Sequence, residues 1–370
     1  MPALYAGDAK HRDAAAGQVV PVPRVQLECG ESRIGANVKE RQMTESTVYF
    51  TRREENIPAA LKLVGVARFS GAAVPVKLHM GEPGNPHALR PQLARTVVRA
   101  IVDAGGRPFL FDTTVAYPGE RSRRDGYERV ARRHGFTQEN VGCSTVIGDR
   151  GVGTVESGVA VEVATALHDA TCMLVLSHVK GHIQAGFGGA IKNLGMGGVT
   201  RASKRLIHHM ARPVHDPALC TRCGLCAAAC PNAALSVNTE WHFDGAACEG
   251  CGKCALACAT GALRFEVMSL ARALAISALA CVRGKDVLYV SSLHSMAANC
   301  DCDPNPGGII CPDIGYLIGS DAAAVDAAAL DLVDRVKPDV FMQCTGVDPR
   351  DQVREAASLG MNDRYVLREL

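Results

Sequence analysis

The run Cys172-Met-Leu-Val-Leu-Ser177 indicates the fold class most clearly. It is an unbroken run of apolar and small residues, without the polar–apolar alternation of a strand that has one face in water. Such a run is typical of a strand buried on both faces, as in a parallel sheet covered by helices. The stretch therefore predicts an α/β fold: a mostly parallel sheet with flanking helices.

Strand-like and helix-like segments alternate on both sides of this run. Further strands are expected at residues 47–51, 74–80, 108–111, 286–290 and 314–318, and helices at residues 89–104, 122–134, 266–281 and 321–336. Alternation of this kind is typical of βαβ units, in which a helix returns the chain to the same edge of the sheet. The predicted sheet therefore draws strands from both halves of the chain.

Composition and charge narrow the possible functions. The 370 residues carry 40 Lys and Arg against 38 Asp and Glu, which argues against a nucleic-acid coat or an acidic tail. No apolar run reaches the ~20 residues of a membrane span, and residues 1–17 lack the pattern of a signal peptide. Sixteen cysteines are more than ordinary packing requires. We expect a cytoplasmic protein, not bound to a membrane, whose cysteines bind a cofactor.

Half of the cysteines lie in residues 215–265, here named the cysteine-rich segment. Two runs in it share the spacing Cys-x-x-Cys-x-x-Cys-x-x-x-Cys; Pro231 follows the first run and Ala259 the second. In two-cluster bacterial ferredoxins with this spacing, the fourth cysteine of each run ligates the cluster of the other run. The predicted ligands are Cys220, Cys223, Cys226 and Cys258 for one 4Fe–4S cluster, and Cys248, Cys251, Cys254 and Cys230 for the other. A pair of zinc knuckles is the alternative.

The cysteine-rich segment interrupts the α/β region and defines the predicted domains. These are an N-terminal extension (1–42), a first α/β part (43–214), a ferredoxin-type domain (215–265), a second α/β part (266–345) and a C-terminal tail (346–370). The first 42 residues show no periodicity, and two explanations stay open. They are either a flexible, possibly disordered extension or the product of a start codon assigned too far upstream.

Several longer motifs carry a resemblance to a known family. They are Lys77-Leu-His-Met-Gly-Glu82-Pro-Gly-Asn85, Phe111-Asp112-Thr-Thr, Tyr117-Pro-Gly119-Glu-Arg121, Ser177-His178-Val-Lys180-Gly-His182, Gly186-Phe-Gly-Gly189-Ala-Ile-Lys192-Asn193-Leu-Gly-Met-Gly, Asn299-Cys-Asp-Cys302 and Pro312-Asp313-Ile-Gly. Over roughly residues 45–340 the chain resembles the iron–sulfur-center proteins of the family called domain of unknown function 362. The resemblance implies an iron–sulfur redox protein and implies no particular reaction or substrate.

Polar side chains follow four of the expected strands at the point where each strand ends. Lys77, His79 and Glu82 close one strand, Asp112 the next, His178, Lys180 and His182 a third, and His294 a fourth. In open α/β sheets, ligands bind outside the carboxyl ends of the strands. We therefore expect these groups to converge on one edge of the sheet, although a single histidine at a strand end is commonly structural.

A basic interval lies in the same region. No carboxylate occurs between Asp169 and Asp216, and of two glycine-rich stretches there the second, Gly195-Met-Gly197-Gly198, precedes a helix expected to run through residue 208. Glycines and helix N-termini allow backbone N–H groups to approach an anion. The predicted anion-binding residues are Lys77, Glu82, Asp112, Lys180, Lys192, Asn193 and Arg201. In the alternative, the glycines allow close packing and the basic side chains form a solvated face.

A second set of cysteines follows the His294 strand. Cys300, Cys302 and Cys311 lie within one short loop, in a spacing that matches no ferredoxin or zinc pattern. Three interpretations stay open: the cysteines ligate a third metal centre, Cys300 and Cys302 form a reactive thiol pair, or the cysteines have neither function.

The combined hypothesis is an oxidoreductase, most simply a reductase. Two 4Fe–4S clusters would receive single electrons from a partner such as a ferredoxin or reductase and pass them to an anionic small molecule. The candidate catalytic residues are His79, His178 and His182 as proton donors, with Cys300 and Cys302. The alternative is a non-enzymatic, ferredoxin-like electron carrier whose α/β domain docks partner proteins. Binding of nucleic acid is unlikely, since the overall charge is balanced and aromatic residues make up only 5%.

Overall fold

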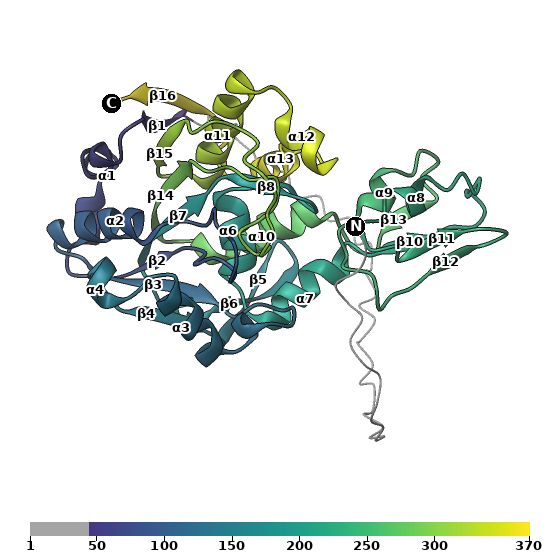
Figure 1. Ribbon diagram of the computed structural model, residues 1–370, viewed down its shortest axis with the longest axis horizontal. Coiled ribbons are helices and arrows are strands. Elements are labelled where there is room, and N and C mark those ends of the chain that lie inside the picture. Colours follow the sequence, from purple (N-terminus) through teal and green to yellow (C-terminus); the bar gives the residue numbers. More distant parts are fainter. Residues whose placement is uncertain (1–43) are drawn as a thin grey trace, which may run out of the picture. The chain divides into compact units, whose positions relative to one another are not determined.

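The computed structural model describes residues 44–370; the predicted N-terminal extension lies outside the described residues (Figure 1). One eight-stranded sheet forms the centre. Its strands are β1 (Ser46–Thr51), β2 (Ala73–Lys77), β3 (Arg107–Thr113), β4 (Thr145–Gly148), β7 (Cys172–His178), β14 (Asp286–Leu293), β15 (Gly315–Gly319) and β16 (Tyr365–Glu369). Their order is β16-β1-β15-β14-β7-β2-β3-β4, so both halves of the chain supply strands.

The sheet is mostly parallel, as predicted. β14, β7, β2, β3 and β4 are parallel neighbours, and β16 is parallel to β1. Only β15 runs the other way, because it pairs antiparallel with both β14 and β1. The parallel strands bring their carboxyl ends to the same edge, which is where ligands bind in open α/β sheets.

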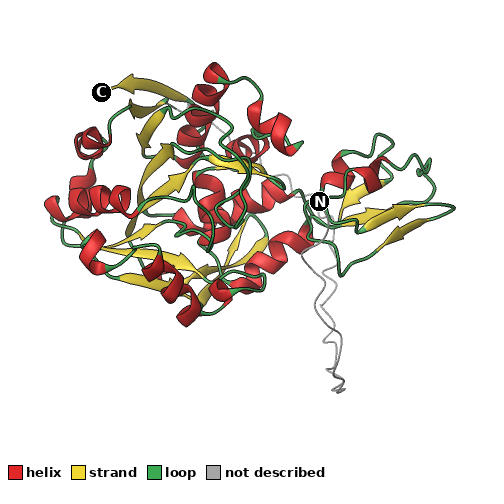
Figure 2. Ribbon diagram, in the orientation of Figure 1, coloured by secondary structure: helices red, strands yellow, loops and turns green. Residues whose placement is uncertain are grey.

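The unbroken apolar run of β7 is explained by helices on both faces of the sheet (Figure 2). Met173 and Val175 belong to one apolar core, and Cys172, Leu174 and Leu176 belong to the other. Side chains of a strand alternate between its faces, so a strand with two cores needs apolar residues at every position.

Each core has its own helices. The first contains side chains of α5 (Thr165–His168), α6 (Ala190–Gly197), α7 (Arg201–Met210), α10 (Leu270–Val282), α11 (Ala322–Val336), α12 (Val340–Thr345) and α13 (Asp351–Ser358). The second contains side chains of α1 (Ile57–Leu63), α2 (Pro91–Asp103), α3 (Arg124–Arg133) and α4 (Gln138–Val141). Short 3₁₀ helices are η1 (Glu54–Asn56), η2 (Val66–Phe69) and η3 (Glu120–Ser122). The α/β class with flanking helices is therefore confirmed.

Two antiparallel hairpins and the C-terminus complete this region. The hairpins are β5 (Gly151–Glu156) with β6 (Val159–Ala164), and β8 (Lys180–His182) with β9 (Gly186–Gly188). Residues 346–370, expected as a tail, instead contain α13 and β16. Because β16 pairs with β1 along its whole length, this part of the chain belongs to the main sheet.

The cysteine-rich region folds as two matching halves. One half contains β10 (Pro213–His215), α8 (Leu225–Ala228) and β11 (Leu235–Val237); the other contains β12 (Trp241–Phe243), α9 (Lys253–Leu256) and β13 (Leu263–Phe265). Every element and every cysteine of the first half recurs 28 residues later in the second. β10 pairs with β13 and β11 with β12, so each half contributes one strand to each two-stranded sheet. The repeated cysteine spacing thus corresponds to a repeated fold.

Candidate functional site

A buried ion pair joins the ends of β2 and β3. The Lys77 ammonium lies 3.0 Å from the Asp112 carboxylate and donates a hydrogen bond of 2.6 Å to Oδ1 of Asn193. The amide of Asn193 donates in turn to the Leu176 carbonyl of β7, and the Tyr127 hydroxyl donates to Asp112. Burial lowers the pKa of Lys77, and Asp112 opposes that shift. These predicted anion-binding residues are satisfied by one another and hold neighbouring strands together.

A second group forms around Arg121, whose side chain is fully buried. Its guanidinium donates to Glu82 at 2.7 Å, lies 2.7 Å from Nε2 of His79 and donates to the Tyr117 hydroxyl. Burial and the charge of Arg121 hold the pKa of His79 well below its ordinary value. His79 is therefore a neutral partner of Arg121. Arg121 belongs to one of the family motifs, but the sequence does not predict it as a site residue. Its role depends on Glu82 and His79, which come from another segment.

Asp301 organises the edge of the sheet beyond β7. Its carboxylate lies 2.9 Å from Nδ1 of His178 and 3.1 Å from the ammonium of Lys180. Nε2 of His178 lies 2.8 Å from the His294 carbonyl, so both ring nitrogens face oxygen acceptors. Burial alone would raise the pKa of Asp301, but His178 and Lys180 lower it well below its ordinary value.

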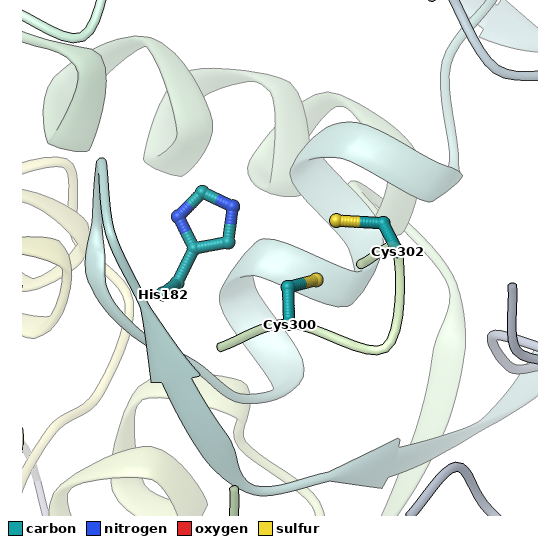
Figure 3. A group of neighbouring side chains, drawn as sticks. All are labelled: His182, Cys300 and Cys302. Carbon is teal, nitrogen blue, oxygen red and sulfur yellow. The ribbon is translucent and has the colours of Figure 1, made fainter. Parts of the chain in front are cut away.

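His182, Cys300 and Cys302 converge on one space (Figure 3). One ligand atom from each side chain lies within 4.8 Å of the other two. His182 comes from β8, and the two cysteines come from the loop after β14. The ammonium of Lys192, on α6, lies 3.6 Å from the sulfur of Cys300. The structure thus brings together four of the residues predicted at the site.

Backbone contacts explain why these segments meet. The N–H of Gly181 donates to the Ala297 carbonyl, and a side chain at Gly181 would overlap the carbonyl of Ala298. Only glycine lets β8 approach the loop this closely. On the other side, the N–H of Glu82 donates to the Asp301 carbonyl. The loop is therefore clamped between β8 and the segment after β2.

The local charges favour one thiolate in this group. The hydrogen bond from Cys302 lowers the pKa of Cys300 well below its ordinary value, against the opposing effect of burial, and Lys192 and Lys180 add to the decrease. The pKa of Cys302 is raised by the same hydrogen bond and by burial. Burial and Lys192 hold the pKa of His182 well below its ordinary value. The surroundings thus favour the thiolate form of Cys300 and the neutral imidazole of His182, which are metal-ligand forms, whereas Cys302 would release its proton on binding a metal.

The structure corrects one prediction about this region and shows that the N-terminus of one helix there is occupied. Cys311, predicted with Cys300 and Cys302, packs in the first apolar core, and His182 takes its place in the group. The N-terminus of α6 is not available to an anion either, because the N–H groups of Ala190 and Ile191 donate to the buried Asp326 carboxylate. Burial raises the pKa of Asp326 to about 7.

Arg201 lies apart from the triad of His182, Cys300 and Cys302. It donates to the Ser122 carbonyl, and its charge acts on Lys204. Lys204 is buried and donates to Thr113 and Thr114 at the end of β3. Burial lowers its pKa to about 7. Arg201 and Lys204 therefore belong to the ion-pair region of β2 and β3.

The cysteine-rich segment contains features suited to a metal cluster. Cys230, Cys248, Cys251 and Cys254 line one pocket. Backbone N–H groups lie 3.2 Å from the sulfur of Cys230 and 3.4 Å from that of Cys248. Burial raises the pKa of Cys254 to about 12, so its thiolate requires a compensating positive group. All cysteines of residues 44–370 are free.

The second predicted cysteine set shows comparable features. Cys226 and Cys258 pack against a small apolar cluster together with Trp241. The N–H of Leu263 donates to the sulfur of Cys258 at 3.3 Å. The buried indole N–H of Trp241 has no oxygen or nitrogen partner within residues 44–370. Trp241 lowers the pKa of the Cys226 thiol, against the larger effect of burial, which raises it. Both sets therefore present sulfurs with N–H donors around them.

Direct contacts connect this segment to the α/β region near the triad. Gly250 lies so close to the carbonyl of His208 that a side chain there would overlap it, and Gln184 donates to Glu249 at 2.7 Å. The charge of His208 acts on His182 and that of Lys192 acts on His208, and burial lowers the pKa of His208 to about 4. Of the two cysteine sets, the one containing Cys248 and Cys251 is thus in contact with His208.

The chain matches the family described as domain of unknown function (DUF362) over residues 74–331. The chain belongs to this family. This membership and the cysteine-rich sequence are consistent with binding of a metal or an iron–sulfur centre. No curated protein matches the chain.

Two solved structures are similar to this member of the family. The lactate racemase apoprotein from Thermoanaerobacterium thermosaccharolyticum is 14% identical, with a TM-score of 0.33, and the match covers 67% of this chain and 51% of that chain. A structural-genomics protein from Thermotoga maritima is 10% identical, with a TM-score of 0.40 and coverage of 83% and 59%. The chain spans between half and three fifths of the length of these two proteins. Among residues 44–370, no helix combines the length and the apolar character needed to cross a bilayer.

Proposed function

We propose that this protein is an iron–sulfur oxidoreductase that delivers single electrons to an anionic small molecule beside His182, Cys300 and Cys302. The observation that carries the proposal is the contact between the two parts: Gly250, in the run Cys248–Cys254, packs on His208 next to the triad. Electron transfer requires the donor and the acceptor to lie close together. This contact supports the proposal that a cluster held by the run Cys248–Cys254 would lie near the substrate. A cytoplasmic location stays a prediction.

The cysteine-rich segment would hold two 4Fe–4S clusters, which supply one electron at a time when bound. The repeated 28-residue unit and the shared pocket of Cys230, Cys248, Cys251 and Cys254 support the predicted exchange of fourth ligands. Backbone N–H groups at Cys230, Cys248 and Cys258 would stabilise thiolate charge. The domain boundary at 215–265 belongs to the same proposal.

Electrons would enter on the side of the other cysteine set. Cys223 is exposed, and the apolar side chains of Leu219 and Leu225, close to it in the chain, are each at least half exposed. Exposed apolar side chains on a small segment favour docking of a partner protein. The same observation favours the alternative function, an electron carrier whose partners dock on both parts.

At the triad, Lys192 is the group best suited to hold an anion. Lys77 and Lys180 are each paired with a buried aspartate, whereas Lys192 has no salt bridge within residues 44–370. His182, a neutral imidazole in the same group, would donate a hydrogen bond to the substrate through its protonated ring nitrogen. His79 and His178 would support the site through Arg121 and Asp301.

Anaerobic isolation and kinetics test this proposal. Any small molecule that copurifies is identified by mass spectrometry, and the protein is then reduced and mixed with that molecule. We expect it to reoxidise the clusters, and we expect Lys192→Ala to slow reoxidation at least about tenfold, the worth of a hydrogen bond to a charged group. Lys62→Ala, at an exposed lysine on α1, is the matched control.

The outcomes distinguish the two functions. Equal reoxidation rates in Lys192→Ala and in the control would contradict the assignment of Lys192. If no small molecule reoxidises the clusters while a partner protein does, the carrier function is correct and the enzyme proposal is wrong.

A further inference from the structure

We infer that His182, Cys300 and Cys302 bind a single transition-metal ion of the kind that prefers thiolate and imidazole ligands, separate from any cluster in the cysteine-rich segment. Their three ligand atoms lie within 4.8 Å of one another. Two ligands of one metal at 2.0–2.3 Å can be at most about 4.6 Å apart. Small side-chain rotations would therefore be sufficient to bring all three into coordination.

The donor set selects the class of metal. Two sulfurs and one imidazole nitrogen suit zinc, iron or copper(I), and they do not suit magnesium or calcium, which require oxygen ligands. Cys300 and His182 are at most 9% exposed, so water competes weakly for these positions. Within residues 44–370 no fourth histidine, cysteine or carboxylate completes the group. Three protein ligands leave one position open, as in catalytic metal sites.

The surroundings hold these ligands in place. Asp301 lies between the two cysteines in the chain, and its carboxylate points to His178 and Lys180. The sulfurs of the cysteines on either side of it lie near each other and near the His182 ring (Figure 3). The loop is thus anchored by one side chain while its neighbours stay available to the metal. The ammonium of Lys192 lies 3.6 Å from the sulfur of Cys300, where its positive charge would stabilise a metal-bound thiolate.

This inference concerns the metal site and does not require the proposed electron transfer. The test uses the full chain with its clusters assembled under anaerobic, reducing conditions. Zinc ions are added in small excess, unbound metal is removed by dialysis, and zinc is counted beside iron and sulfide. X-ray absorption at the zinc edge then measures the number of sulfur neighbours.

We expect one added zinc per chain, with two sulfur neighbours at about 2.3 Å. Cys302→Ser and His182→Gln should each weaken zinc binding more than about 100-fold. Loss of a residue that only hydrogen-bonds to a metal ligand already lowers metal affinity by about 10–100-fold. Iron and sulfide should not change in these variants. Cys344→Ser and Cys311→Ser, at cysteines outside the group, are the matched controls and should bind zinc as the wild type does.

Three results would overturn the inference. The first is a reduced wild-type chain that takes up no zinc beyond its clusters. The second is zinc that stays bound in both His182→Gln and Cys302→Ser. The third is a Cys300–Cys302 disulfide that persists under reducing conditions and excludes the metal. Failure of cluster assembly would be recognised separately by the iron and sulfide counts.

Discussion

Nδ1 of His178 and Oδ1 of Asp301 lie 2.9 Å apart, although 123 residues separate them in the chain. This pair ties the end of β7 to the loop that carries Cys300 and Cys302. Lys180 adds a second positive charge at 3.1 Å from the same carboxylate. The position of the two thiols at the sheet edge therefore depends on one buried aspartate.

Asp301→Asn should destabilise the fold. The substitution leaves Lys180 and His178 buried without a counter-charge, and breaking a buried pair costs ~3–5 kcal/mol. Urea unfolding at pH 7 measures the loss. Because the folded pKa of Asp301 lies below its unfolded value of ~3.9, its stabilisation is present above that pH and is lost as pH falls through the folded pKa.

The control for this prediction is Asp125→Asn, at an exposed ion pair with Arg129. It should change the free energy of unfolding very little. If both substitutions had equally small effects, Asp301 would not be the anchor of the loop.

Lys204 should make stability depend on pH in the alkaline range. Burial lowers its folded pKa to about 7, below the ~10.4 of an unfolded lysine. Between these values the unfolded state binds more protons, so its contribution to stability rises with pH, by up to ~1.4 kcal/mol per unit. Lys204→Met should remove this slope in urea unfolding measured at pH 7, 8 and 9. Parallel curves for wild type and variant would show that Lys204 is not held neutral.

The cysteine-rich segment should be removable. The N–H of Glu266 donates to the Arg212 carbonyl at 2.8 Å, and β10 and β13 pair antiparallel just inside them. The chain therefore enters and leaves the segment at one place. Replacing residues 213–265 by a short Gly/Ser linker should leave an α/β domain that unfolds cooperatively in urea. A product without a cooperative transition would mean that contacts such as Gly250 with His208 are required for folding.

Trp241 should report one of the two predicted clusters. It is the only tryptophan of the chain, and it packs with Cys226 in the small apolar cluster. A nearby iron–sulfur cluster quenches indole fluorescence by accepting its excitation energy. Cys223→Ser, which removes a ligand of the same set as Cys226, should increase the fluorescence of the anaerobically loaded protein. Cys251→Ser, in the other set, is the matched control; an equal increase in both variants would contradict the assignment of ligands.

Local sequence patterns predicted the fold well because they depend on nearest neighbours. The apolar run of β7 indicated two covered faces, and Met173 and Leu174 indeed lie in different cores. The direction of β15 could not be predicted, since an isolated strand carries no signal for the direction of its partners. The sequence predicts a tail for residues 346–370 and no strand. The reason is that β16 is formed by pairing with β1, which lies at the other end of the described chain.

The site was predictable where it depends on the ends of parallel strands, and missed where it depends on distant partners. Lys77 and Asp112 meet because β2 and β3 are parallel neighbours. Arg121 and Asp301 also depend on partners from distant segments, Glu82 and His178, which no spacing in the sequence reveals. Cys311 was grouped with Cys300 by proximity in the sequence, but the loop between them places it in the apolar core.

The iron and acid-labile sulfide content of the full chain after anaerobic reconstitution distinguishes two 4Fe–4S clusters from bound zinc. We expect about eight iron and eight sulfide per chain, and loss or conversion of one cluster in Cys223→Ser while the signal of the other remains. Cys344→Ser, at an exposed cysteine outside both sets, should retain the full iron and sulfide content. A chain that binds zinc at the eight cysteines and takes up no iron would contradict the account.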